Sequence, residues 1–340
     1  MFAPNRASSL QRLQGAAMLL FAISADAIAA ESWSTACVEQ QMQIVAPTTT
    51  VAELKEICAT KPGETAPEDK LIESRIQGEQ AAARSRFAVT AHRRNYFLPI
   101  TYMSDPNEAP FAQIDPDPGV DLDNIEAKFQ LSVKTTLFDN LILKNDAIQF
   151  GFTATSFWQM YNKELSSPFR ETNYEPEVFW LAPLRWTPWD VDTTLAAVGL
   201  SHQSNGQAGS LSRSWNRLYA NFIWEKGDYV FSFKPWYRLP ESKKKEPGDP
   251  RGDDNPDIGD YMGNFEFTTV YKREHHEFSL MLRNNLSSDN KGAIQIEWTF
   301  PLLKNLRGYA QYFNGYGESL IDYDARIERI GVGFLLTDLL

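Results

Sequence analysis

Hydrophobic and polar residues alternate along most of the chain from about residue 87 onward. In the clearest stretch, residues 123–137, apolar side chains such as Phe129 stand between polar ones such as Lys128. Successive side chains of a β-strand point to opposite faces, so a period of two predicts strands with one apolar and one polar face. We therefore expect residues 86–340 to form an all-β fold.

About twelve segments show this alternation, and most have the length of about ten residues that is typical of strands in an outer-membrane barrel. They are residues 95–103, 123–137, 146–160, 172–183, 192–205, 213–225, 228–239, 258–272, 276–286, 291–300, 306–314 and 326–338. The first is the weakest, because Pro99 has no amide hydrogen for the ladder. We predict a twelve-stranded antiparallel transmembrane β-barrel. A soluble β-sandwich is the alternative, since it would show the same period.

The connections between these segments alternate in length. The gaps at 226–227 and 301–305 are short, whereas those at 104–122 and 240–257 are longer and polar. In outer-membrane barrels the short turns face the periplasm and the long loops face the outside. We therefore expect the loops at 206–212 and 240–257 to share the outer end.

The N-terminus has the features of an export signal. Arg6 and Arg12 precede an apolar run over residues 16–23, and Ala27-Ile28-Ala29 fits a signal-peptidase site. The run is too short to span a bilayer as a helix. Residues 1–30 are therefore predicted to be a signal peptide on a protein of the bacterial outer membrane.

Residues 31–85 differ in composition from the rest of the chain, since Glu, Gln, Ala and Lys dominate there. We predict a periplasmic extension that is partly helical, over 68–86, or partly disordered. Cys37 and Cys58 lie in it, and in an oxidising compartment they are free to pair or to remain apart.

Composition narrows the range of partners. The chain has 33 Lys and Arg against 44 Asp and Glu, a net charge of −11, which argues against a nucleic-acid partner. Aromatic residues make up 13% of the chain, enough for the aromatic girdles that flank the apolar band of a membrane barrel.

Candidate chemistry lies where two of the expected strands meet. His202 and Ser204 are two residues apart, so they share one face of a strand, and a hairpin through the following loop would bring Asn216 beside His202. These are the residue types of a nucleophile, a base and an orienting group. A His-x-Ser pair alone is a weak signal, because most such residues are ordinary hydrogen-bonded ones.

The face that these residues share is apolar on both strands. His202 and Ser204 continue the series Val198 and Leu200, and Asn216 continues into Leu218. In a soluble enzyme that face would be core, whereas in a membrane barrel it would face lipid. The barrel interpretation therefore predicts a lipid substrate.

An asparagine in the third position has a physical consequence. Its oxygen can fix the imidazole tautomer, but it carries no negative charge to compensate an imidazolium. The acidic residues Asp253, Asp254 and Asp257 in an outer loop offer oxygen ligands for a cation such as Ca²⁺, and a solvated acidic loop is the alternative.

At these residues the chain resembles the outer-membrane phospholipase A family, through several long motifs in order from about residue 120 to the C-terminus. The motifs are Ser166-Ser-Pro-Phe-Arg-Glu-Thr-Asn-Tyr-Glu-Pro176, His202-Gln-Ser-Asn-Gly206, Ser212-Arg-Ser-Trp-Asn-Arg-Leu-Tyr219, Lys234-Pro-Trp-Tyr237, Asp253-Asp-Asn-Pro-Asp257 and Gly315-Tyr-Gly-Glu-Ser-Leu-Ile-Asp-Tyr323.

The resemblance implies a twelve-stranded barrel with a Ser-His-Asn triad at Ser204, His202 and Asn216. It implies hydrolysis of phospholipid esters at both acyl positions, lysophospholipase activity, and activation by a calcium-dependent homodimer. The family's calcium positions correspond to the residues Gln207 (through its carbonyl) and Ser212 of one subunit, Ser166 of the other, and Asp254 nearby.

We expect the amides of Ser204 and Gly206 to stabilise the oxyanion of the reaction. The alternative is a non-enzymatic barrel, a porin or scaffold with a degenerate site. In either case Glu126, Lys128 and Arg329, together with Lys134 and Glu266, are expected to fill a narrow lumen by pairing.

Overall fold

The computed structural model describes residues 71–72, 75–76, 89–112, 121–184, 193–246, 249, 251–304 and 306–337. The chain divides into two compact units, Met1–Glu68 and Asp69–Leu340, and every described residue belongs to the second. The predicted signal peptide, Cys37, Cys58 and most of the predicted extension lie outside the described residues.

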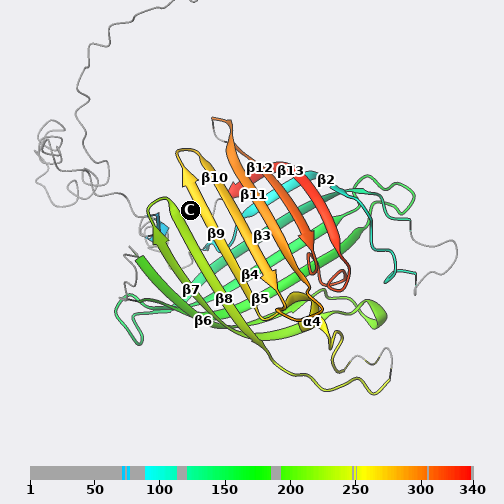
Figure 1. Cartoon of the computed structure of the whole chain (residues 1–340), viewed down its shortest axis with the longest axis horizontal. Coiled ribbons are helices and arrows are strands. Elements are labelled where there is room, and N and C mark those ends of the chain that lie inside the picture. The colour runs from blue at the N-terminus through cyan, green and yellow to red at the C-terminus, as the bar shows by residue number, and fades with distance from the viewer. Residues whose placement is uncertain are drawn as a thin grey trace, which may run out of the picture. The chain divides into compact units, whose positions relative to one another are not determined.

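The described chain forms a closed antiparallel β-barrel of twelve strands, β2 to β13 (Figure 1). Neighbours in sequence pair with each other, and β2 also pairs with β13, which closes the barrel. The two-residue strand β1 (Thr90–Ala91) pairs with β3 just before β2 begins. The twelve strands are β2 Asn95–Met103, β3 Ile125–Asp139, β4 Ala147–Trp158, β5 Phe169–Pro183, β6 Thr193–Ser204, β7 Ser214–Lys226, β8 Tyr229–Arg238, β9 Phe265–Arg273, β10 His276–Asn284, β11 Gly292–Leu303, β12 Leu306–Gly315 and β13 Ile327–Thr337.

These bounds confirm the predicted barrel and its alternation of short and long connections. The short turns at 227–228 and 274–275 lie at one end, which we call the turn end. The long connections at 205–213 and 239–264 lie at the other, the loop end. Pro99 has the expected effect, because the pairing of β2 shifts register between Leu98 and Thr101.

One predicted strand was wrong at its start. The segment 258–272 was expected to be extended throughout, but Ile258–Met262 is the short helix α4 and β9 begins only at Phe265. Ile258 and Met262 are four residues apart, so a helix puts both on one side, where both are buried. Gly263 ends the helix at φ +67°, a conformation that favours glycine.

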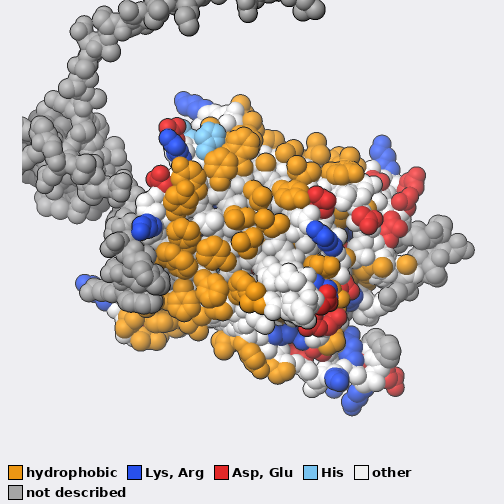
Figure 2. Space-filling model, viewed as in Figure 1, with side chains coloured by type: hydrophobic (Ala, Val, Ile, Leu, Met, Phe, Trp, Pro, Cys, Tyr) orange, Lys and Arg blue, Asp and Glu red, His pale blue; other side chains and the backbone are white. Residues whose placement is uncertain are grey.

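The outer face of the barrel is apolar. Figure 2 shows hydrophobic side chains spread over the strands, with charged side chains gathered near the loop end around α4. Large apolar side chains are exposed on strand after strand, as a lipid-facing band requires. Examples are Ile100, Leu131, Phe150, Val178, Leu200, Leu218, Phe233, Leu282, Ile296 and Val332. No helix among the described residues is long and apolar enough to cross a bilayer.

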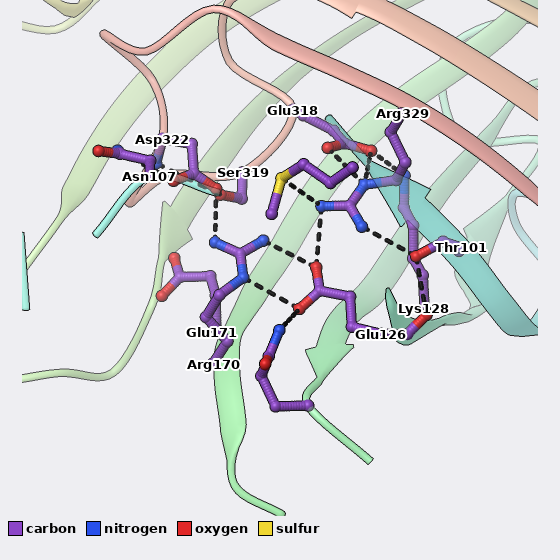
Figure 3. A network of polar contacts seen from close by, with 12 residues as sticks. Thr101, Asn107, Glu126, Lys128, Arg170, Glu171, Glu318, Ser319, Asp322 and Arg329 are labelled. Carbon is purple, nitrogen blue, oxygen red and sulfur yellow. Dashed lines mark hydrogen bonds and ion pairs between the residues drawn. The ribbon is translucent and has the colours of Figure 1, made fainter. Parts of the chain in front are cut away.

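The inward face is charged, and its charges pair with one another (Figure 3). Glu126 binds the guanidinium groups of Arg170 at 3.0 Å and Arg329 at 2.8 Å. Glu318, which the loop between β12 and β13 carries inward, binds Arg329 at 2.8 Å and Lys128 at 2.9 Å. The expected pairing of Glu126, Lys128 and Arg329 in the lumen is therefore present. Removing one partner of such a buried network leaves the other charge unpaired, which typically destabilises a protein by about 3–5 kcal/mol.

A piece of the N-terminal segment packs against strands at the turn end. Residues 71–72 and 75–76 are helical, and the backbone amides of Leu71 and Ile72 both donate to the Glu225 carboxylate at 2.7 Å. Ile72 is buried against Leu195 and Val230. Next to it a cavity of about 480 Å³ remains inside the barrel.

Candidate active site on the outer face of a hairpin

Strands β6 and β7 form one hairpin at the loop end, and its register brings the candidate residues together. His202 pairs directly with Asn216, and Ser204 pairs with Ser214. The two-residue spacing in the sequence predicted that His202 and Asn216 would lie side by side on adjacent strands. The observed strand pairing agrees with this prediction. Ser204 is the last residue of β6, so it stands where the strand passes into the 205–213 loop.

The candidate residues lie on the outer face of the barrel. Leu200 lies two residues before His202 on the same face and is 55% exposed. Leu218 lies two residues after Asn216 on the same face and is 43% exposed. His202 is exposed, and Ser204 is half-buried. Ser201, of opposite parity, is buried in the lumen, where its hydroxyl donates to Glu175 at 2.8 Å. The hairpin thus presents polar groups within an apolar, outward surface.

Asn216 holds the imidazole of His202. The distance between His202 Nδ1 and Asn216 Oδ1 is 2.8 Å. Because the amide oxygen only accepts, Nδ1 carries the proton and Nε2 is left with a free lone pair. That is the tautomer of a general base. Among the described residues no hydrogen bond joins Ser204 Oγ to His202, and such bonds often tighten only when substrate is bound.

The loop after Ser204 is braced by a buried side chain. Asn205 donates to the carbonyl of Leu211 at 2.8 Å, and its oxygen accepts the amides of Arg213 at 3.0 Å and Gln207 at 3.2 Å. Gly206 has φ +66°, which favours glycine. These contacts hold the backbone amides that follow Ser204 in one arrangement.

A cluster of oxygen atoms lies beside this loop. Asp254 Oδ2 accepts the hydroxyl of Ser212 at 2.8 Å and that of Ser214 at 3.3 Å. Its other oxygen pairs with Lys244 Nζ at 2.5 Å. One carboxylate with neighbouring hydroxyls suits a hard cation such as Ca²⁺, and the ammonium of Lys244 shows that this position favours positive charge.

The other predicted calcium positions, Gln207 and Ser166, make no hydrogen bond with Asp254 among the described residues. Gln207 is exposed in the same loop as Ser212. Ser166 lies in the separate loop between β4 and β5, with its amide bonded to the carbonyl of Lys163 at 3.2 Å. Within this one described chain no hydrogen bond links Ser166 to Gln207, Ser212 or Asp254. The described residues also contain no group of three or more His, Cys, Asp or Glu side chains placed to hold a metal ion.

The remaining acidic residues of the 240–257 loop have structural partners. Asp253 pairs with Arg238 at 2.5 Å, and Asp257 accepts the hydroxyl of Tyr323 at 2.7 Å. Burial and the neighbouring carboxylate of Asp257 raise the pKa of Tyr323 above its usual range, so this phenol stays protonated as a donor. Of the three aspartates, only Asp254 reaches the candidate site.

Sequence reasoning missed two residues that contact the site. Glu241 accepts a hydrogen bond from Asn216 Nδ2 at 3.0 Å, and Lys244 pairs with Asp254. Both lie in an irregular loop, where no period relates a residue to its neighbours in space. The only available signal was the density of charge in the segment after Arg238.

Comparisons with known proteins agree on one family. The family model described as Phospholipase A1 matches residues 72–336. The chain is 36% identical to the phospholipase A1 of Escherichia coli K12 over 255 residues, which cover 74% of this chain and 83% of that protein. It is 35% identical to a putative phospholipase A1 of Neisseria meningitidis, over 75% of this chain and 67% of that protein.

Two solved structures are similar over most of the barrel. The outer membrane phospholipase A of Escherichia coli superposes with a TM-score of 0.66 at 35% identity, covering 75% of this chain and all of that one. The Salmonella typhi outer membrane phospholipase, solved as a dimer with bound calcium, gives 0.65 at 34% identity, covering 75% of this chain and 94% of that one.

Proposed function

This chain belongs to the phospholipase A1 family and hydrolyses phospholipids in the outer membrane, and we propose that His202, Ser204 and Asn216 are its catalytic triad. The observation that carries the proposal is the 2.8 Å contact between His202 Nδ1 and Asn216 Oδ1 on an exposed, apolar surface. A base held in the right tautomer beside a serine, on a face that meets acyl chains, is suited to lipid esters.

In the proposed reaction, Ser204 Oγ attacks the ester carbonyl carbon while His202 Nε2 takes its proton. The tetrahedral intermediate collapses, and His202 returns the proton to the leaving glycerol oxygen. This releases lysophospholipid and leaves an acyl-serine. Water, deprotonated by the same nitrogen, then releases the fatty acid. Asn216 holds the ring throughout.

The negative charge of the intermediate needs donors in place beforehand. We assign this role to the amides of Ser204 and Gly206, which the contacts of Asn205 keep in register. Ca²⁺ would add positive charge beside the same oxyanion when bound. We propose that it is held by Ser212, Asp254 and the carbonyl of Gln207, together with Ser166 of the partner subunit, in a calcium-dependent homodimer.

We also propose that residues 1–30 are removed as a signal peptide and that residues 31–85 lie in the periplasm. The contacts of Leu71 and Ile72 with Glu225 at the turn end support a periplasmic location of the extension, since short turns of such barrels face the periplasm. The alternative of a non-enzymatic barrel does not fit, because the relatives are phospholipases over most of the chain.

The triad is tested by single alanine substitutions in detergent-solubilised protein with saturating calcium. Ser204→Ala and His202→Ala should each lower kcat by several orders of magnitude, because triad members act as a unit. Ser201→Ala, on the same strand but facing the lumen, is the matched control and should keep most activity. Heat-modifiability on gels reports folding. A folded Ser204→Ala protein with full activity would exclude the triad.

A further inference from the structure

We infer that Glu241 is a positioning residue for the reaction, acting on His202 through Asn216. This inference rests on the proposed triad. A continuous chain of contacts runs from the imidazole to the amide at 2.8 Å and from the amide to the Glu241 carboxylate at 3.0 Å. Glu241 would fix the orientation of the amide and supply the negative charge that an asparagine lacks.

The orientation of the amide is set by hydrogen-bond chemistry. An ionised carboxylate only accepts, so the side of the Asn216 amide that faces Glu241 must be its NH₂ group. The amide oxygen then necessarily faces His202 Nδ1. If the amide were turned over, its NH₂ would face the ring and would favour the tautomer with the proton on Nε2. That tautomer cannot take a proton from Ser204.

The backbone places Glu241 beside Asn216. Strand β8 ends at Arg238, which pairs with Arg217, and the amide of the next residue, Leu239, donates to the carbonyl of Asn216 at 2.8 Å. The chain therefore leaves the sheet directly alongside Asn216. Two residues later the side chain of Glu241 is half-buried, and its carboxylate accepts the hydrogen bond from the side-chain amide of Asn216.

Two basic side chains close to Glu241 in the sequence have acidic partners of their own. Lys244 pairs with Asp254, and Arg238 pairs with Asp253. In the described part of the chain no salt bridge involves Glu241, and its one side-chain hydrogen bond comes from Asn216. Among these residues, the Asn216 amide is therefore the hydrogen-bond partner of the Glu241 carboxylate.

A charge at this position has a physical role. When His202 becomes an imidazolium, a neutral asparagine offers only a dipole, whereas a carboxylate behind it polarises the amide towards the ring. Asn216 and Glu241 are both half-buried, so their electrostatic interactions are less screened than in water. The arrangement would therefore lower the barrier chiefly through kcat, while KM for the lipid stays nearly constant.

The test compares Glu241→Gln, which keeps an acceptor without the charge, with Glu241→Ala, which keeps neither. We expect kcat to fall about tenfold to a hundredfold in Glu241→Ala and less in Glu241→Gln, with KM within about twofold of the wild type. Glu246→Ala removes an equal charge from an exposed position of the same loop and should leave kcat within about twofold of the wild type.

A second pair of variants separates positioning from mere structural support. Asn216→Asp would place two carboxylates against each other and should be poorly active. Adding Glu241→Gln relieves the repulsion, so Asn216→Asp with Glu241→Gln should be more active than Asn216→Asp alone. A purely structural Glu241 would make the double variant worse.

Three results would overturn the inference. One is wild-type kcat in folded Glu241→Ala, and another is a double variant no better than Asn216→Asp. The third is full recovery of Glu241→Ala by added calcium, since Glu241 would then act through the metal. Failure of the triad itself shows differently, as full activity in Ser204→Ala.

Discussion

At the scale of residues, the site depends on what each group can donate or accept. In the proposed triad, Asn216 would orient the base without exchanging a proton, whereas His202 and Ser204 would both exchange one. The three are therefore not equivalent, even though all lie on one hairpin.

We predict that Asn216→Ala loses less activity than His202→Ala, because an unoriented imidazole still samples the productive tautomer. The loss in kcat should be smaller by at least about tenfold. Initial rates on one phospholipid substrate, with folding checked on gels, measure the difference. Equal losses in the two variants would mean that orientation is as essential as the proton transfer.

Gly206 gives a prediction about the backbone. Its φ of +66° is unfavourable for an L-residue by about 1–2 kcal/mol, so Gly206→Ala should shift the loop that carries the proposed oxyanion amides. We expect kcat to fall while KM changes little, because these amides act in the transition state. Gly209→Ala, at φ +65° in the same loop, is the control and should keep most activity.

The common face of His202, Ser204 and Asn216 was predictable from the sequence, whereas the residues that contact them from other elements were not. Strand parity alone places His202, Ser204 and Asn216 on one face, since a two-residue period holds wherever pairing is regular. Glu241 follows the end of β8, where no ladder fixes its position, so its contact with Asn216 depends on the whole loop packing against the barrel.

At the scale of elements, the loop between β8 and β9 supplies what the hairpin lacks. It brings Glu241 to Asn216 and Asp254 to Ser212. It then turns through α4, whose apolar residues pack into a cluster with Trp215 and Leu320. The period-two pattern failed there because the segment buries its apolar side chains inward at the loop end, where they follow helical spacing.

Lys244 gives a prediction at this scale. Its ammonium pairs with Asp254 Oδ1 at 2.5 Å, so a calcium ion bound there as proposed would have to compete with it. Lys244→Gln should therefore lower the calcium concentration for half-saturation severalfold, and Asp254→Ala should raise it. Calcium titration by calorimetry measures both. Lys243→Gln makes the same charge change at an exposed neighbouring position and should leave the calcium concentration for half-saturation unchanged. If Lys243→Gln lowered that concentration as much as Lys244→Gln does, the effect would come from net charge and not from the pair with Asp254.

At the scale of the whole molecule, the barrel separates a polar inside from an apolar outside. The network of Glu126, Arg170 and Arg329 lies in the lumen, whereas His202 and Ser204 lie on the outer face among exposed leucines. We therefore expect substrate to reach Ser204 from the membrane. We predict that a lipophilic sulfonyl fluoride inactivates the enzyme while a water-soluble reagent confined to the lumen does not. Mass spectrometry of the labelled Ser204 peptide reports which route was used.

In the proposed calcium site, one barrel alone would hold an incomplete set of ligands, because Ser166 lies in a different loop from Ser212 and Asp254. Anything that binds only the dimer shifts the monomer–dimer equilibrium towards it. We expect calcium to increase cross-linked dimer and activity together, chelator to abolish both without unfolding, and Ser212→Ala to raise the calcium needed. Full turnover by a chelated monomer would contradict this coupling.

The outward placement of His202 and Ser204 changes what concentration means for this enzyme. A substrate that arrives sideways through a leaflet is counted per unit of surface, as a mole fraction among its neighbours, and not per unit of volume. Turnover should fall when the same amount of phospholipid is spread among inert amphiphiles. The products, a single-chain lipid and a fatty acid, are released into that same leaflet, so each catalytic cycle alters the solvent in which the next one takes place.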